Sequence, residues 1–153
     1  KTVDASLAFV WMMGVLPPDD KHVRQTVEAI KEHLWIPTQI GGIARYQDDY
    51  YHRGFDTASN PQIPGNPWII TTLWYADWII ETAKNSEDLL KARELLDWVI
   101  SKANSSGILP EQIDPFSGQP LSVAPLTWSH SEFVLAVMRY RKKMKKLGLC
   151  DNC

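Results

Sequence analysis

The feature that most constrains this fold is the alternation of two kinds of helical segment along the chain. Residues 4–13, 68–83 and 129–146 have helical patterns with apolar residues on most faces, although the last becomes basic toward its end. Residues 20–34 and 86–100 instead place their apolar residues on one face. Buried helices that alternate with half-exposed ones are typical of a ring in which outer helices cover inner ones. The sequence therefore predicts an all-α fold of about five helices forming part of a toroid.

Local signals predict where these helices begin and end. Gly14 should follow the first helix as its C-terminal cap, and one of the aspartates of Asp19-Asp20 should precede the second as its N-terminal cap. Pro67 is expected in the first turn of the third helix, where proline is tolerated. Ser86 is expected to cap the fourth.

Two long irregular loops, 35–66 and 104–127, contrast with the short links 14–20 and 84–87. Helices joined by short links run antiparallel, so the short links should lie at one end of the fold and the long loops at the other. Long loops in a compact domain are usually functional or disordered. Because both are rich in carboxylates and aromatic residues, we expect a functional site at the loop end.

Composition excludes several classes of partner. The net charge of −2 gives no electrostatic basis for binding nucleic acid or an anionic membrane, and no apolar run is long enough to span a bilayer. The basic residues within 139–146 fit cations that stay solvated at a helix C-terminus. We therefore expect neither nucleic acid nor a membrane as a partner.

The two cysteines, Cys150 and Cys153, form one Cys-x-x-Cys pair at the end of the chain, without the second pair that a zinc site needs. We expect them to be free thiols, which favours a reducing compartment and a cytoplasmic protein. The histidines do not cluster with carboxylates or cysteines at zinc spacing, so neither a metal nor a cofactor is expected. The same absence argues against a zinc-dependent toroid enzyme.

The two loops have the composition of a sugar site. Segments 41–51 and 107–115 hold an arginine, carboxylates, amides and aromatic rings. The polar groups can bind neighbouring hydroxyls in pairs while the rings cover C–H faces, which suits a polyhydroxylated ligand. Alternatively, Asp48 and Asp49 are solvated loop charges. Of the seven tryptophans, most are expected in the core and one or two in the site.

Five stretches carry a family resemblance. They are the opening stretch, in two parts at 4–7 and 16–20, the Gly-x-x-Arg-Tyr-x-x-Asp-x-Tyr-like segment at 42–51, Gly-Asn-Pro-Trp at 65–68, Leu-Pro-Glu-Gln at 109–112, and the Trp-Ser-His segment within 125–130. Together and in this order they resemble glycoside hydrolase family 15, which contains glucoamylases, glucodextranases and some trehalases. The resemblance implies an (α/α)6 toroid of twelve helices, of which residues 1–147 would be the C-terminal portion and 148–153 a short tail.

The resemblance also implies a chemistry and assigns roles to residues. Family members release glucose from the non-reducing ends of α-glucosides by inversion, in which one carboxylic acid protonates the leaving oxygen and one carboxylate activates water. Glu111 is implied as the general base. Residues of the two loops and of the neighbouring helix starts are implied as substrate-binding: Arg45, Tyr46, Asp48, Trp68, Gln112 and Trp128. Asp49 is an alternative that would fix the loop instead, and His130 is expected to be a buried, hydrogen-bonded histidine near the site.

One part of the family's site is missing from the sequence. The general acid of the family usually lies near a Trp-Glu pair, and no such pair occurs here. We therefore expect a fragment that is inactive alone, whose apolar faces would be covered by the N-terminal part of the enzyme or by a second copy. The alternative is a non-catalytic helical scaffold or carbohydrate-binding module that dimerises through the open ring face.

Overall fold

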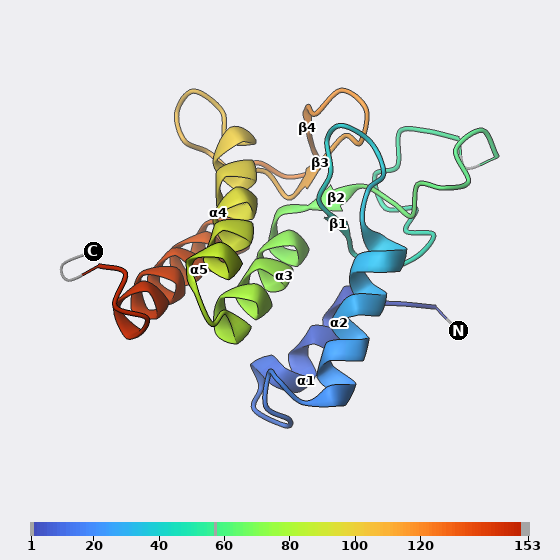
Figure 1. Ribbon diagram of the computed structural model, residues 1–153. Helices are drawn as coiled ribbons and strands as arrows, with labels where there is room; N and C mark the ends of the chain where they lie inside the picture. The colour runs from blue at the N-terminus through green and yellow to red at the C-terminus, as the bar shows by residue number, and fades with distance from the viewer. Residues whose placement is uncertain (1, 57, 151–153) are drawn as a thin grey trace.

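The computed structural model describes residues 2–56 and 58–150, and helices form about half of it (Figure 1). The first helical segment is a short 3-10 helix, η1, that continues into α1; four longer helices follow. Their bounds are η1 Ala5–Ala8, α1 Phe9–Met12, α2 Lys21–Leu34, α3 Ile69–Thr82, α4 Ser86–Ser101 and α5 Thr127–Lys146. The prediction of an all-α fold with five helical segments is confirmed, apart from one small sheet.

Helix α3 lies at the centre, with α4 and α5 on one side and η1 with α2 on the other (Figure 1). The short links α1–α2 and α3–α4 lie at the lower end in this view, and both long loops lie at the upper end. This is the arrangement that the link lengths predict.

A small antiparallel sheet joins the long loops, which the sequence analysis did not anticipate. Its strands are β1 Ile43–Ala44, β2 Pro67–Trp68, β3 Gln112–Ile113 and β4 Pro120–Leu121, in the order β1-β2-β3-β4. The placement of Pro67 in the first turn of a helix is therefore wrong. Pro67 lies in β2, and Trp68 keeps an extended backbone as the N-cap of α3.

The helix caps follow the sequence in two of three cases. Asp20, one of the two aspartates predicted, caps α2 by accepting a hydrogen bond from the His22 amide at 2.7 Å. Gly14 follows α1 with a φ of +72°, also as predicted. The cap of α4 is Asn85 and not Ser86, because Asn85 has the extended backbone of a cap and its Oδ1 accepts from the Asp88 amide at 2.9 Å.

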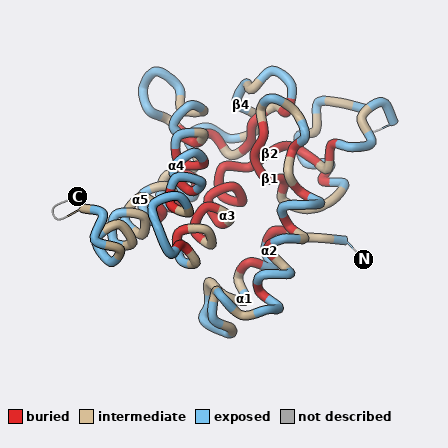
Figure 2. The backbone as a smooth tube through the Cα atoms, viewed as in Figure 1, coloured by how far each residue is buried: buried red, intermediate tan, exposed pale blue. Residues whose placement is uncertain are grey.

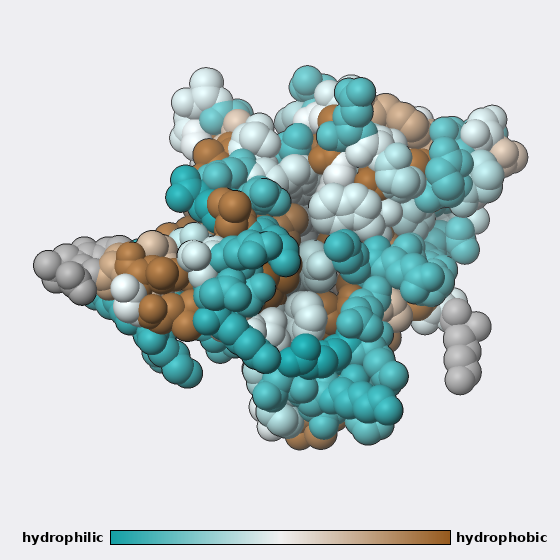
Figure 3. Space-filling model, in the orientation of Figure 1, coloured by the Kyte–Doolittle hydropathy of each residue, from teal (hydrophilic) through white to brown (hydrophobic). Residues whose placement is uncertain are grey.

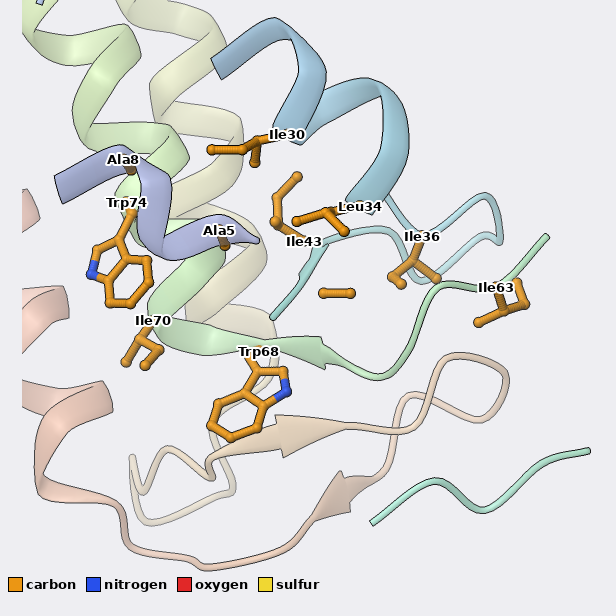
Figure 4. Close-up of a cluster of buried hydrophobic side chains, with 11 residues drawn as sticks. Ala5, Ala8, Ile30, Leu34, Ile36, Ile43, Ile63, Trp68, Ile70 and Trp74 are labelled. Atoms are coloured by element: carbon orange, nitrogen blue, oxygen red, sulfur yellow. The ribbon is translucent and has the colours of Figure 1, made fainter. Parts of the chain in front are cut away.

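The core runs along both sides of α3, which is buried over most of its length (Figure 2). One cluster joins α3 to η1, α2 and the sheet, and Figure 4 shows Trp68 and Trp74 at its edge, away from Ile30 and Leu34 of α2. The second cluster joins α3 to α4, α5 and β3. Trp68 and Trp74 are buried and Trp128 is 48% exposed, in line with the expectation that few tryptophans are free for a site.

Two segments predicted to be buried are only partly so: 4–13 buries Ala5 and Ala8 of η1, and about half of α5 is exposed. Helix α1 has no buried residue, and α5 has only Ser129, Glu132 and Ala136 among its described residues. Apolar side chains are exposed on both outer flanks; they are Leu7, Val10, Met13 and Val15 on one and Val134, Leu135 and Met138 on the other. Apolar atoms are visible at the lower tip and over the left end in Figure 3. The expected uncovered apolar faces are therefore confirmed.

Cys150 is disulfide-bonded, so the prediction of a free thiol at this position is wrong; Cys153 lies outside the described residues. The argument for a reducing compartment, which depended on free thiols, loses that support. Within residues 2–56 and 58–150, no helix has the length and apolar character needed to cross a membrane.

Gly42 provides a test of the junction between the sheet and α4. Its φ is +91°, and a Cβ there would lie 2.7 Å from Cζ2 of Trp98 and 2.8 Å from Cβ of Pro67. Gly14 also has a positive φ, but a Cβ would meet no atom within 4 Å. We expect Gly42→Ala to lower the free energy of unfolding by about 2 kcal/mol or more, from backbone strain and overpacking. Gly14→Ala should cost about 1 kcal/mol, from backbone strain alone. Equal urea midpoints for the two variants would contradict this packing.

Candidate active site

The small sheet brings distant parts of the chain to one place. Trp68 in β2 pairs with Ile43 of β1 on one side and with Gln112 of β3 on the other. Arg45 directly follows β1, and Glu111 directly precedes β3. The Ile69 amide at the start of α3 also donates a hydrogen bond to the carbonyl of Glu111 at 3.2 Å. Two residues from the first loop and two from the second therefore lie around the N-terminus of α3, at the loop end of the fold (Figure 1).

The Glu111 carboxylate is held through one of its two oxygens. Its Oε2 accepts hydrogen bonds from the Ser122 hydroxyl and from Nε2 of Gln112, the latter at 3.1 Å. Its backbone amide donates to the Val123 carbonyl at 2.9 Å, which ties Glu111 to the same returning segment as Ser122. The Oε1 atom forms no hydrogen bond with the described residues. A carboxylate oriented in this way can accept a proton at Oε1 without breaking its own contacts.

Gln112 links Glu111 to the Gly-Asn-Pro-Trp segment. It is completely buried, and its Oε1 accepts from Nδ2 of Asn66 at 2.8 Å. The same Asn66 amide donates to the His52 carbonyl at 3.0 Å. The oxygen and the nitrogen of the Gln112 side-chain amide are thus both hydrogen-bonded inside the protein, and the nitrogen donates to Glu111.

The start of α5 holds the two residues that precede Glu111. The Ser129 hydroxyl donates to the Pro110 carbonyl at 2.8 Å, and the Leu109 amide donates to Nε2 of His130 at 3.0 Å. His130 is therefore hydrogen-bonded, as predicted, although it is half-buried and not fully buried. The described residues contain no group of three or more His, Cys, Asp or Glu that is arranged to hold a metal ion.

Arg45 and Asp49 form a two-pronged ion pair. Nε and Nη2 of Arg45 each donate to a different oxygen of Asp49 at 2.9 Å. Asp49 is 1% exposed, and its Oδ1 also accepts from the Tyr51 amide at 3.0 Å. Asp49 therefore fixes the loop, which was the alternative drawn from the sequence.

Three aromatic rings surround the Arg45 guanidinium. Its central carbon lies 4.6 Å from the ring centre of Trp68, 4.8 Å from that of Tyr46 and 5.2 Å from that of Tyr51. Trp68 and Tyr51 are themselves stacked, with centres 6.1 Å apart. Trp68 is only 4% exposed whereas Tyr51 is 46% exposed, so Tyr51 presents more aromatic surface to solvent. The Tyr46 hydroxyl accepts from Nη2 of Arg45 at 3.3 Å.

Two predicted site residues stand apart from this group. Asp48 is exposed, has a φ of +59° and forms no hydrogen bond or ion pair with any described residue. Trp128 lies in the first turn of α5, with its ring centre 5.9 Å from that of Trp74. Both side chains remain accessible to a ligand, although no contact joins them to Arg45 or Glu111.

Three residues that lie at the site, Asn66, Tyr51 and Ser122, have no role among the sequence-based predictions. Asn66 and Tyr51 lie inside motifs quoted for the family resemblance, so their membership was the available signal. Ser122 follows Glu111 by eleven positions and carries no local signal, because only the antiparallel return from β3 to β4 brings its hydroxyl back.

The Arg45–Asp49 pair provides a matched test of this geometry. Arg45→Ala would leave the buried Asp49 carboxylate unpaired, and we expect it to lower the free energy of unfolding by about 2 kcal/mol or more. This is below the cost of losing a fully buried pair because the Arg45 side chain is 34% exposed. Arg93 and Asp97 have the same spacing but are exposed, so Arg93→Ala should leave the urea midpoint unchanged. A similar shift in both variants would contradict the buried role of Asp49.

Comparisons with known proteins agree with the geometry. The sequence profile of glycosyl hydrolases family 15 matches residues 1–138. An uncharacterized glycosyl hydrolase of Methanocaldococcus jannaschii is 35% identical over 147 residues, covering 90% of this chain and 22% of that protein. A trehalase of Thermoplasma volcanium is 30% identical over 146 residues, covering 95% and 20%. A glucoamylase of Clostridium sp. is 29% identical over 139 residues, covering 87% and 18%.

Solved structures show the same fold. A bacterial glucoamylase crystallised with acarbose superposes with a TM-score of 0.77 at 24% identity, over 94% of this chain and 21% of that one. The chain spans about a fifth of the length of the curated relatives it matches. The family profile covers nine-tenths of the chain, and the partial ring of helices with its loop-end site accords with it. The chain therefore belongs to glycosyl hydrolases family 15.

Proposed function

We propose that this chain supplies the base side of an inverting α-glucoside hydrolase site, with Glu111 as the general base. The observation that carries the proposal is the Glu111 carboxylate itself. One oxygen is anchored by Ser122 and Gln112, and the other is unengaged by the described residues. The site lies at the loop end, beside an arginine and exposed aromatic surface, which is where the family resemblance expects the sugar.

The reaction follows from that orientation. Water placed against Oε1 of Glu111 gives its proton to the carboxylate as its oxygen forms a bond to the anomeric carbon. The glycosidic C–O bond breaks on the opposite side, and a general acid protonates the leaving oxygen. Inversion requires about 6.5–9.5 Å between the two carboxyl groups, so that water fits beside the base. The released glucose is then the β-anomer.

The substrate is an α-linked glucoside, bound at its non-reducing end. Arg45, Tyr46 and Asp48 offer donors and acceptors for hydroxyl groups, and the exposed rings of Tyr51 and Trp128 offer stacking surface for C–H faces. Trp68 and Gln112 are buried, and we expect them to hold these sugar-contacting side chains in position. Relatives named trehalase and glucoamylase both accord with an α-glucoside, and they leave the linkage open.

The general acid is proposed to come from outside this chain. No Trp-Glu pair occurs here, and the chain covers only about a fifth of its relatives. The exposed apolar flanks of α1 and α5 fit the remaining helices of the toroid, with residues 1–147 as its C-terminal portion. Without the acid, we expect the chain alone to lose about 10²–10⁴-fold in rate, leaving it close to inactive.

The same exposed flanks favour a second candidate, a scaffold that dimerises through its open faces. The mass of the assembly, measured by native mass spectrometry, and an assay of turnover together distinguish the hydrolase from the scaffold. A stable dimer that shows no turnover, even when the missing part of the enzyme is added, supports the scaffold. Turnover on addition of that part supports the hydrolase.

The role of Glu111 is tested by Glu111→Gln in the assembled enzyme. The change keeps the shape of the side chain but removes the base, so we expect kcat to fall by about 10²–10⁴-fold. Sugar binding, followed by calorimetry, should be retained. Glu94→Gln on the exposed face of α4 is the matched control and should leave kcat unchanged. Full activity of Glu111→Gln would remove Glu111 from the mechanism.

A further inference from the structure

Three charged side chains outside the candidate site meet between α3 and α5. Asp77 of α3 is completely buried, and Glu132 of α5 is 7% exposed. Arg139 of α5 donates hydrogen bonds to Oδ2 of Asp77 and to Oε1 of Glu132, the second at 3.3 Å. This α3–α5 charge cluster (Asp77, Glu132 and Arg139) has no part in the mechanism proposed above. It also removes Arg139 from the solvated basic tail that the sequence predicts.

The cluster has too few cations and too few donors for two ionised carboxylates. One guanidinium serves both acids, and its side chain is 35% exposed. The Oδ1 atom of Asp77 is buried and accepts no hydrogen bond from the described residues. An ionised carboxylate in this position would lose hydration that the single Arg139 contact at Oδ2 replaces only in part. A protonated acid avoids that cost and can share its proton with the second carboxylate.

Neighbouring elements do not supply the missing cation. On α4, Arg93 and Asp97 pair with each other on the exposed side, at 2.9 Å. On α5, the Lys143 ammonium donates to the Glu81 carbonyl at 2.7 Å. Within the described part of the chain, the charged groups that act on Asp77 are Arg139 and Glu132.

We propose that Asp77 keeps a proton below neutral pH, in its place beside Glu132 and Arg139, and that this proton keeps α5 packed against α3. With the proton present, the cluster has one positive and one negative charge. Once it leaves, two buried carboxylates face one guanidinium, and their repulsion loosens the contact between the helices. The cluster is thus a pH-sensitive positioning device.

The direction of the pH effect follows from the environment of Asp77. Burial raises its pKa to about 7, helped by the neighbouring Glu132 and opposed by Arg139. The ordinary value is 3.8, so between these two values the folded chain holds a proton that the unfolded chain has lost. Stability is therefore greatest below the ordinary pKa, falls as the pH rises toward about 7, and levels off above it.

The device acts on the candidate site through the first turn of α5. Ser129 and His130 hold Pro110 and Leu109, the residues that precede Glu111. Loosening α5 from α3 therefore displaces the segment that carries Glu111. This last step rests on the proposed function, whereas the proton on Asp77 does not.

The test uses the full 153-residue chain labelled with ¹³C at its aspartate carboxyl groups. A titration followed by NMR should show one aspartate that changes ionisation near neutral pH. Its signal should be absent in Asp77→Asn and kept in Asp97→Asn, the exposed control. As the pH rises from the ordinary pKa of 3.8 toward about 7, the equilibrium constant for unfolding of the wild type should increase by up to about tenfold per pH unit relative to Asp77→Asn.

A second measurement keeps the proposal testable if Asp77→Asn does not fold. The wild-type titration is then assigned with Glu132→Gln, which removes one of the two negative charges and should shift the midpoint to lower pH. Exchange of the Leu109 amide should lose protection above neutral pH in the wild type but not in Glu132→Gln, where no second carboxylate repels Asp77. Titration of every aspartate below about pH 5 would overturn the proposal, against the ordinary range for this side chain. These readouts need no sugar turnover, so their failure is distinct from a failure of Glu111 as the base.

Discussion

The backbone pairing of Trp68 with both Ile43 and Gln112 is the constraint on which the candidate site depends. Without it, two long loops would run independently over the end of the helices. Pairing satisfies backbone groups of the buried segment that leads into α3, and an unpaired buried peptide group would be costly. The same pairing sets Arg45 and Glu111 around one helix N-terminus, so the demands of backbone hydrogen bonding and of the site are met by one small sheet.

Successive hydrogen bonds hold Glu111 in position. Ser122 and Gln112 hold its carboxylate, Asn66 holds Gln112, and the first turn of α5 holds the residues before it. Arg45 is held in turn by a buried Asp49. Groups locked in this way lose little freedom when a sugar binds, which is the usual requirement for catalysis by positioning. The α3–α5 charge cluster holds α5 against α3, and α5 in turn holds the residues before Glu111.

Sequence periodicity predicted the helices well because each has an apolar pattern of helical spacing. The lengths of the links predicted the loop end, because short links make consecutive helices antiparallel. Periodicity missed the sheet because strands of two residues have no measurable period. For the same reason, Pro67 was assigned to the helix α3 and not to the strand β2 that precedes it. Arg45, Trp68 and Glu111 were assigned as candidates through motifs, whereas Ser122 and Asp77 acquire their surroundings only from contacts distant in sequence. The disulfide at Cys150 was missed because spacing alone does not reveal the oxidation state.

The measurement that bears most directly on this account is the anomer of the first glucose released from maltotriose, followed by proton NMR in the proposed assembled enzyme. A general base at Glu111 that activates water opposite the leaving group predicts β-glucose before mutarotation. Release of α-glucose would show retention, and with it a covalent intermediate that is incompatible with Glu111 as an activator of water.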